Sequence, residues 1–493
     1  MARRIDIDPL TTLVEHAEYA HLSPSVAALR EEAAPVVGAL RGRTLWMINS
    51  TERGGGVSEM LPGMIAHLRE LGIRAEWVVI ESADDDFFQL TKRIHNMIHG
   101  DGPAGLSEDD RRLLERVNRE NAETLRSEIR RGDVVVVHDP QPMPIAGMLR
   151  ESTDITAVWR CHIGLDATNA ATTDAWRFLQ PYAIHYDHAV FSAPEYAPPY
   201  FEGRSSIIYP ALDPLTAKNR PLHVQAVVAV LERAALLRLA EPALEPPFDS
   251  PARRYQPDGS WQPAFRPSDI GLLTRPIITQ VSRWDRLKGF LPLMQGFARF
   301  KQRLTRDTAH DDDVRRRLTQ SRLVLAGPDP DSIADDPEGR EVLEELCAAY
   351  LACDADVRAE VALLALPMDD PAVNALIVNA LQRVSTIVVQ NSLREGFGLT
   401  ITEAMWKGVP VLSNSRACGP RQQVRDCVDG RLIGDPEDVR EIADALHAML
   451  SSDQLETWAH NAQQRVHEHF LIYSQLRHWV RLLATLTGAV KAA

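Results

Sequence analysis

The stretch from residue 386 to residue 406 restricts the fold of this chain more than any other. It opens with T-I-V-V-Q, a β-branched run typical of a buried strand, and closes with T-E-A-M-W, which has helix-forming character. Between them lies the glycine loop E-G-F-G. The order of strand, glycine loop and helix is typical of α/β sheets that bind a ligand at the carboxyl ends of their strands.

The loop has the properties of a binding site for a phosphorylated ligand rich in hydroxyl groups. Gly396 and Gly398 allow the backbone to approach a ligand closely, and the start of the following helix offers unpaired N–H groups to an anion. Glu395 in the loop and Glu403 in the helix are suited to accept hydrogen bonds from sugar hydroxyls. A sugar joined to a phosphate satisfies both features.

The same order of strand, loop and helix occurs at two other places. A strand predicted at 44–49 is joined to a helix by a run of three glycines, which suits backbone contact with a phosphate or sugar. A strand predicted at 276–281 is followed by a loop with two cations, Arg283 and Lys288. Because a guanidinium can fork two phosphate oxygens and an ammonium adds a mobile charge, the two are suited to clamp a pyrophosphate.

Two predicted strands in the first half of the chain end in histidine. They are D-V-V-V-V-H, which ends at His138, and T-A-V-W-R-C-H, which ends at His162. Ligands gather outside the carboxyl ends of such strands, so His138, Asp139 and Gln141 are candidate site residues. Two histidines at successive strand ends favour a functional role over a purely structural one.

Strands alternate with helices over most of the chain, which predicts two doubly wound α/β domains with the ligand crevice between their facing carboxyl ends. At 493 residues the chain suits two domains of roughly 200 residues each. We assign residues 1–215 to the first domain, 216–269 to an insertion or linker, and 270–469 to the second domain. The last helix, within 470–493, is expected to cross back to the first domain.

The composition argues against several classes of function. A formal charge of −14 does not suit a general nucleic-acid or anionic-membrane surface. No apolar run approaches about 18 residues and the start M-A-R-R-I-D-I-D-P-L lacks an apolar region, so we expect a cytoplasmic protein. The five cysteines are scattered and are expected to be reduced thiols. The acidic runs at 84–86 and 311–313 are expected to be solvated, not metal-binding.

The loop motifs together resemble a known family. The E-x7-E spacing from Glu395 to Glu403 resembles the donor-site signature of retaining glycosyltransferases with the GT-B fold, which has two Rossmann-like domains. Further motifs resemble the trehalose glycosyltransferring synthases and the related retaining trehalose phosphorylases: H-D-P-Q-P, W-R-C-H-I, I-Y-P-A-L-D-P-L, Q-V-S-R-W-D-R-L-K-G and E-A-M-W-K-G-V-P-V. The resemblance covers about residues 44–215 and 270–470.

The resemblance implies reversible transfer of glucose from a nucleoside diphosphate glucose to glucose, with retention of the α configuration, to form trehalose without a metal or other cofactor. It places Arg283 and Lys288 on the diphosphate, Glu395 on the donor sugar, Glu403 on the ribose, and His138 near the reacting sugar. We expect the catalytic residues to be His138, Arg283, Lys288 and Glu395. Further donor contacts are expected at Gly55, Gly56, Gly396, Phe397, Gly398, Leu399 and Thr400. Acceptor contacts are expected at Asp139, Gln141, Arg160 and His162.

Two departures from the family pattern leave alternatives open. Residues 417–423 contain one glycine where the family has a paired-glycine loop, which bears on donor or acceptor preference, and the segment 217–268 is longer than the family predicts. The alternatives are a phosphorylase that uses inorganic phosphate, a transferase with another small acceptor, and a non-catalytic sugar-nucleotide sensor. The nucleotide base, the favoured direction and a homodimer also stay open.

Overall fold

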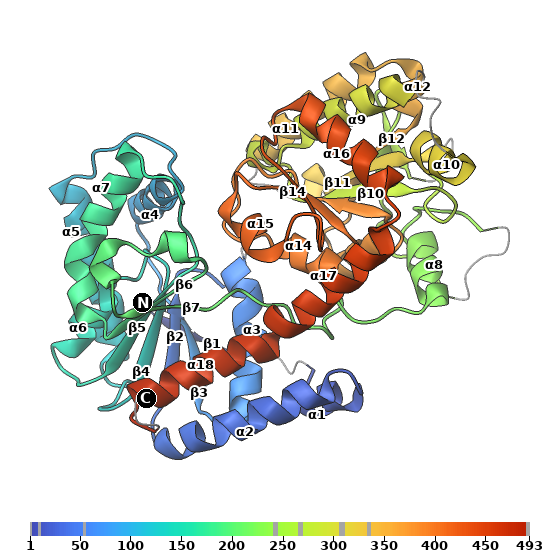
Figure 1. Ribbon diagram of the computed structural model, residues 1–493. Coiled ribbons are helices and arrows are strands. Elements are labelled where there is room, and N and C mark those ends of the chain that lie inside the picture. The colour runs from blue at the N-terminus through green and yellow to red at the C-terminus, as the bar shows by residue number, and fades with distance from the viewer. Residues whose placement is uncertain are drawn as a thin grey trace. The chain divides into compact units, whose positions relative to one another are not determined.

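The computed structural model describes residues 2–7, 11–52, 56–239, 245–264, 270–304, 311–332 and 337–489. The chain forms two compact units, each built on one sheet with helices packed around it (Figure 1). Unit 1 contains Met1–Asp213 and His469–Ala493, and unit 2 contains Pro214–Glu468. This architecture confirms the predicted α/β class with two Rossmann-like sheets.

Unit 1 is built on a seven-stranded sheet in the order β1-β3-β2-β4-β5-β6-β7. The strands are β1 (Arg3–Ile5), β2 (Leu45–Asn49), β3 (Ala75–Val79), β4 (Val134–His138), β5 (Thr156–Cys161), β6 (His188–Phe191) and β7 (Ser205–Ile207). Only β1 runs antiparallel to its neighbour. Every residue of β4 is buried, as its run of valines predicts for a strand covered on both faces.

The helices of unit 1 cover this sheet, and the last one comes from the far end of the chain. They are α1 (Leu13–Glu18), α2 (Ser23–Ala39), α3 (Gly56–Glu70), α4 (Asp85–Ile98), α5 (Glu108–Leu125), α6 (Ile145–Arg150), α7 (Ala170–Leu179) and α18 (Ile472–Leu486), with the 3₁₀ helices η1 (Gln180–His185), η2 (Pro194–Tyr196) and η3 (Pro199–Phe201). α18 packs against α2 and α3. The N–H of Leu212 donates to the carbonyl of Phe470 at 2.9 Å, which attaches the start of this helix to unit 1.

Unit 2 is built on an eight-stranded sheet in the order β15-β14-β13-β10-β11-β12-β8-β9. The strands are β8 (Arg253–Tyr255), β9 (Trp261–Pro263), β10 (Ile277–Val281), β11 (Arg322–Pro328), β12 (Val361–Leu366), β13 (Ile387–Val389), β14 (Val411–Asn414) and β15 (Gly430–Ile433). All pairs are parallel except those of β8 with β12 and with β9.

Both faces of this second sheet are covered, because alternate side chains enter two separate hydrophobic clusters. Ile278 of β10 packs with Phe290 and Phe297 of α9 on one face, whereas Ile277 belongs to the cluster on the other face. The helices are α8 (Val224–Arg233), α9 (Phe290–Leu304), α10 (Asp312–Gln320), α11 (Pro337–Ala352), α12 (Ala355–Ala359), α13 (Pro371–Arg383), α14 (Leu399–Trp406), α15 (Cys418–Gln423), α16 (Val439–Ser451) and α17 (Leu455–His469), with η4 (Arg286–Lys288) and η5 (Pro330–Ser332).

The segment 216–269, predicted as an insertion or linker, is part of unit 2 in the structure. Its helix α8 packs against α13, and its strands β8 and β9 extend the sheet beyond β12 in antiparallel pairing. Each of these strands has three residues, which is too short for an alternating pattern to show in the sequence.

No helix within the described ranges is long and apolar enough to cross a bilayer.

Candidate active site

Two neighbouring strands of unit 2 bring the predicted donor residues to one edge of the sheet. β10 and β13 pair in parallel, so their carboxyl ends open at the same edge. The loops that follow, 282–289 and 390–398, lie side by side, and the N–H of Leu393 donates to the carbonyl of Leu287 at 2.7 Å.

Side chains of the first loop hold its backbone in place. Trp284 is buried, and its indole Nε1 donates to the carbonyl of Pro328 at 2.7 Å. The carboxylate of Asp285 accepts a hydrogen bond from the N–H of Leu287 at 2.8 Å and thereby caps η4. Contacts within the protein therefore define the backbone position of Lys288, the last residue of η4.

The two loops also approach each other too closely for a side chain at Gly289. This residue has a φ of 61°, and a Cβ there would lie 2.2 Å from the carbonyl oxygen of Asn391. Gln280 of β10 connects the two loops. Its Nε2 donates to the carbonyl of Lys288 at 2.7 Å, and its Oε1 accepts from the N–H of Asn391 at 3.0 Å. The two loops thus form one rigid unit.

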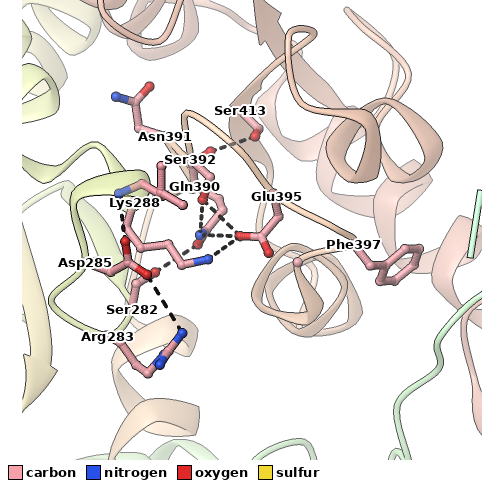
Figure 2. A network of polar contacts seen from close by, with 12 residues as sticks. Ser282, Arg283, Asp285, Lys288, Gln390, Asn391, Ser392, Glu395, Phe397 and Ser413 are labelled. Atoms are coloured by element: carbon pink, nitrogen blue, oxygen red, sulfur yellow. Dashed lines mark hydrogen bonds and ion pairs between the residues drawn. The ribbon is translucent and has the colours of Figure 1, made fainter. Parts of the chain in front are cut away.

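The predicted site residues Lys288 and Glu395 form an ion pair (Figure 2). Lys288 Nζ lies 2.6 Å from Glu395 Oε2, and the two side chains are 17% and 14% exposed. The same carboxylate oxygen accepts from Ser392 Oγ at 3.0 Å and from Gln390 Nε2 at 3.4 Å. Ser282 Oγ donates to Gln390 Oε1 at 3.2 Å, which fixes the amide orientation. Glu395 is therefore held in one place.

Arg283 does not take part in this ion pair. Its side chain is 74% exposed, and its Nη2 lies 3.8 Å from Asp285 Oδ2. In Figure 2 its guanidinium lies apart from Lys288 and Glu395. The structure thus brings two of the three predicted groups together and leaves the guanidinium in solvent.

The glycine loop ends where α14 begins. Gly398, the residue before the helix, has a φ of 85°, and no side chain caps the helix start. Phe397 is buried, and a Cβ on Gly419 would lie 2.5 Å from its Cα. Gln423 Nε2 donates to the carbonyl of Gly398 at 3.4 Å. Leu399 and Thr400 form the first turn of α14, so the predicted donor contacts from Gly396 to Thr400 lie along one continuous backbone segment.

Glu403 is buried on α14. Two lysines that the sequence did not identify as site residues lie close to it. Lys218 Nζ is 3.6 Å from Glu403 Oε1. Lys407, one turn further, donates to the carbonyl of Glu403 at 3.1 Å and to Asn219 Oδ1 at 3.3 Å. Burial lowers the pKa of Lys407 to about 7, and Glu403 partly offsets this effect.

The predicted residues of unit 1 gather at the carboxyl ends of β4 and β5, which are adjacent in the sheet. His138 Nδ1 lies 3.1 Å from His162 Nε2, and His138 Nε2 lies 3.4 Å from Met47 Sδ. Asp139 has a φ of 64°, and its Oδ1 accepts from the N–H of His162 at 2.8 Å. The ring of His138 is therefore buried at the end of β4. The positive φ of Asp139 belongs to the turn that follows this strand.

Arg160 lies inside unit 1 with 1% exposure. Its Nη2 donates to Ser192 Oγ at 3.2 Å and to the carbonyl of Ile208 at 2.8 Å. A cavity of about 10 Å³, large enough for one water, is lined by Val57, Met60, Leu61, Met64, His138, Arg160, His162, Gln475 and Trp479. This space is too small for an acceptor sugar, and the contact of Arg160 with the acceptor stays a prediction.

Burial changes the protonation of this cluster. It lowers the pKa of His138 to about 3, with a further contribution from the charge of Arg160. It raises the pKa of Asp139 to about 6, against the opposing effects of the His162 N–H and of Arg160. It lowers the pKa of Arg160 to about 10, against the opposing effect of Asp139. His138 is thus neutral at pH 7.

The remaining predicted site residues are Gln141, Gly55 and Gly56. The carbonyl of Gln141 accepts from Asn118 Nδ2 at 3.0 Å. Gly56 is the first residue of α3, and among the described residues no atom outside its chain neighbours and the backbone of its own helix lies within 4 Å of a Cβ built on it. Gly55 lies outside the described residues.

Sequence reasoning missed the residues that position the donor groups, namely Ser282, Gln280, Gln390, Ser392, Lys218 and Lys407. Gln390 had a usable signal, because it is a polar residue directly after a buried strand and before the glycine loop. Lys218 had no such signal in the sequence. It is far from Glu403 along the chain, and only the folded structure brings the two side chains together.

Comparison with known families matches two regions of the chain. Residues 47–198 match the family described as trehalose synthase, N-terminal domain, and residues 268–465 match glycosyl transferases group 1. The first region contains β3 to β6 and the end of β2, with His138 and His162, and the second contains the loops 282–289 and 390–398.

Relatives and solved structures agree with these matches. A trehalose synthase of Pyrococcus horikoshii is 32% identical over 91% of each chain. A trehalose phosphorylase of Grifola frondosa is 22% identical over 88% of this chain and 56% of its own length. A solved UDP-forming α,α-trehalose-phosphate synthase of Burkholderia xenovorans superposes with a TM-score of 0.60 at 17% identity, covering 90% of this chain and 100% of that one.

The relation to trehalose synthases extends over nearly the whole chain, and the two doubly wound sheets match GT-B neighbours. The chain therefore belongs to the trehalose synthase family, within the glycosyltransferases of GT-B fold.

Proposed function

We propose that this glycosyltransferase moves glucose from a nucleoside diphosphate glucose to glucose, with retention of the α configuration, and forms trehalose reversibly. The observation that carries the proposal is the Lys288–Glu395 ion pair next to the uncapped start of α14. It places a cation, a carboxylate and the N-terminal N–H groups of a helix together, which suits a sugar joined to a diphosphate.

The cations and the helix start stabilise the leaving group. When the nucleoside diphosphate departs, negative charge grows on the phosphate oxygen that leaves the anomeric carbon. Lys288 and the start of α14 lie on adjacent loops, and Arg283 is exposed on the same loop as Lys288. Their interaction with that charge is stronger in the transition state than in the bound donor, so it accelerates the reaction without a metal ion.

Retention follows from attack on the same face that the leaving group vacates. The bond between the anomeric carbon and the phosphate oxygen breaks through an oxocarbenium-like state. The acceptor hydroxyl oxygen then bonds to the anomeric carbon, and its proton passes to the departing phosphate oxygen. Glu395, held by Lys288 and Ser392, accepts hydrogen bonds from the donor sugar and keeps it aligned.

The other residues take binding roles in this proposal. Glu403 accepts hydrogen bonds from the ribose, and Asp139 and His162 contact the acceptor with support from His138 and Arg160. The solved Burkholderia xenovorans protein is a UDP-forming enzyme in complex with glucose-6-phosphate, which supports a nucleoside diphosphate as the leaving group in this fold.

The test is product identification with the purified full chain. We expect ADP-, GDP- or UDP-glucose plus glucose to yield α,α-trehalose, observed by the anomeric signals in proton NMR, at a rate that added Mg²⁺ or Mn²⁺ does not change. The reverse reaction is measured with trehalose plus each nucleoside diphosphate. Glucose 1-phosphate from trehalose plus inorganic phosphate would instead identify a phosphorylase, and no transfer to glucose would indicate another acceptor.

A further inference from the structure

A cluster of two histidines and one aspartate lies inside unit 1, at positions far in sequence from the donor loops. His16 comes from α1, His67 from α3, and Asp213 from the end of the connection after β7. The exposed fractions of these residues are 0%, 0% and 9%. One nitrogen of each ring and one carboxylate oxygen all lie within 4.8 Å of one another.

The distances in this cluster are too long for ordinary hydrogen bonds. His16 Nε2 lies 3.5 Å from Asp213 Oδ1, and His67 Nε2 lies 3.5 Å from Asp213 Oδ2. A direct N–H···O hydrogen bond is typically about 2.7–3.2 Å long. Among the described residues, neither ring nitrogen of His67 has a hydrogen-bond partner. A buried imidazole without partners is costly, so this ring is suited to bind a further group.

The same distances suit a metal ion held between the three groups. Nitrogen and oxygen ligands bind Zn²⁺ at about 2.0–2.2 Å in a tetrahedron, so neighbouring ligand atoms lie about 3.3–3.6 Å apart. The two ring-to-carboxylate distances of 3.5 Å, which end on different oxygens of Asp213, fall in this range, and one ligand atom from each of the three residues lies within 4.8 Å of the others. Thr11 Oγ1 is hydrogen-bonded to His16 Nε2 at 3.0 Å and to Asp213 Oδ2 at 3.4 Å, so this hydroxyl lies next to both groups.

A hydrogen bond at the outer ring nitrogen orients the imidazole of His16 for this role, whereas the outer nitrogen of His67 faces a carboxylate beyond hydrogen-bond distance. His16 Nδ1 lies 2.5 Å from Tyr473 Oη of α18, and His67 Nδ1 lies 3.9 Å from Glu70 Oε2. If each Nδ1 carries the proton, each Nε2 presents its lone pair toward Asp213. A hydrogen bond from the outer nitrogen to a hydroxyl or carboxylate is the usual arrangement around metal-binding histidine.

We propose that unit 1 binds one Zn²⁺ ion through His16 Nε2, His67 Nε2 and the Asp213 carboxylate, with the hydroxyl of Thr11 or a water as the fourth ligand. Two imidazoles favour Zn²⁺ over Mg²⁺ and Ca²⁺, which prefer oxygen ligands only. The ion connects α1 with α3 and with the connection that leaves unit 1 at Asp213. It is structural, and the proposed glucosyl transfer does not use it.

The first test measures metal content and affinity in the purified full chain. The chain is stripped with dipicolinate, and Zn²⁺ is titrated against a chromophoric chelator. We expect one site per chain with a dissociation constant below about 1 µM. Mg²⁺ at millimolar concentration should not compete. Bound Zn²⁺ should also raise the midpoint of thermal unfolding by about 5–10 °C relative to the stripped chain.

The matched variant is His67→Gln, because glutamine has a similar reach and can donate to Asp213 but is a poor ligand for zinc. We expect it to weaken binding more than about a hundredfold, since loss of outer partners alone costs about 10–100-fold. Tyr473→Phe removes only the partner of His16 and should weaken binding about tenfold or more while keeping the fold. His478→Ala, an exposed histidine on the same helix as Tyr473, is the control and should bind as the wild type does.

Two results would overturn the site. One is a stripped wild-type chain that binds no zinc with micromolar affinity. The other is zinc binding of unchanged affinity in His67→Gln and in Tyr473→Phe, which would assign the metal to surface groups. Trehalose formation is not the readout in either case, so failure of this site and failure of the proposed reaction remain distinct.

Discussion

At the scale of single residues, Lys288 and Arg283 differ in what they do before a donor binds. Lys288 is largely buried and already neutralises Glu395. Arg283 is mostly exposed, and its guanidinium lies 3.8 Å from the Asp285 carboxylate. Removing Lys288 therefore leaves a carboxylate without its cation, whereas removing Arg283 costs the ligand-free chain almost nothing.

Lys288→Ala is expected to lower both turnover and stability. Loss of one donor that stabilises the leaving group should reduce kcat by about 10²–10³-fold, with a smaller effect on the donor KM. The free energy of unfolding should fall by about 1–3 kcal/mol, because Glu395 stays partly buried without Lys288. Steady-state kinetics and urea unfolding measure the two effects. Arg286→Ala, on the same loop but paired with exposed Glu345, is the control and should behave as wild type.

Arg283→Lys is expected to separate activity from stability. An ammonium keeps the charge but cannot fork two phosphate oxygens, so turnover should fall about tenfold to a thousandfold. The midpoint of thermal unfolding should not change. Combined with Lys288→Ala, the loss should be less than the product of the two single losses, since both groups serve one leaving group. Wild-type turnover in folded Arg283→Ala and Lys288→Ala would refute the donor assignment.

Asp139→Asn is expected to stabilise unit 1 at neutral pH and to weaken the acceptor site. Burial raises the pKa of Asp139 from 3.8 to about 6, so ionisation costs more in the folded chain than in the unfolded one. This destabilisation is complete above pH 6 and disappears as the pH falls toward 4, where both states are protonated.

Thermal unfolding at pH 5 and pH 8 tests this difference. At pH 8 the asparagine variant should be more stable by up to about 3 kcal/mol, and the gain should shrink at pH 5. Asp154→Asn, at an exposed carboxylate with 81% exposure, should show no such dependence. An equal gain at both pH values would indicate that the raised pKa is not the cause.

At the scale of elements, the start of α15 supports the donor loop. Gly419 lies so close to Phe397 that a Cβ would be 2.4 Å from its carbonyl oxygen. This contact explains why one glycine remains where the family pattern led us to expect two. The backbone of the loop, and with it the start of α14, cannot keep its position if Gly419 carries a side chain.

Gly419→Ala is expected to displace the loop and to raise the donor KM at least tenfold, which is about 1.4 kcal/mol of binding energy. Glucose binding should change less. Gly38→Ala in α2 is the matched control, because nothing lies within 4 Å of its Cβ, and there alanine should be neutral or stabilising by about 0.5–1 kcal/mol. Unchanged donor kinetics in Gly419→Ala would show that the loop 390–398 tolerates a side chain at Gly419.

At the scale of the whole molecule, each unit has its own sheet and core, so a ligand of one unit should protect that unit first. A nucleoside diphosphate at about 100 times its Kd should stabilise its unit by about 2.7 kcal/mol. Hydrogen exchange followed by mass spectrometry should show the protection at 282–289 and 390–406, and the Arg283→Ala/Lys288→Ala variant should lack it. Protection restricted to unit 1 would place the nucleotide elsewhere.

The sequence by itself determined the fold class and the order of the site motifs. Runs such as V-V-V-V-H in β4 and T-I-V-V-Q around β13 are long, apolar and bounded by loops, so they predict buried parallel strands without reference to the rest of the chain. Glycine loops after those strands are equally local. Together with the family resemblance they were sufficient to identify Lys288, Glu395 and the residues from Gly396 to Thr400 as donor-site candidates.

Tertiary structure alone decided which of these groups meet and which are buried. Lys288 and Glu395 are 107 positions apart, and they pair only because β10 and β13 are neighbours in the sheet. The burial of Arg160 and the meeting of His16, His67 and Asp213 likewise depend on segments that are distant in sequence. Strand pattern and glycine position are properties of the local sequence, so the sequence alone predicts them. Side-chain distances and desolvation are properties of the packed chain, so only the tertiary structure determines them.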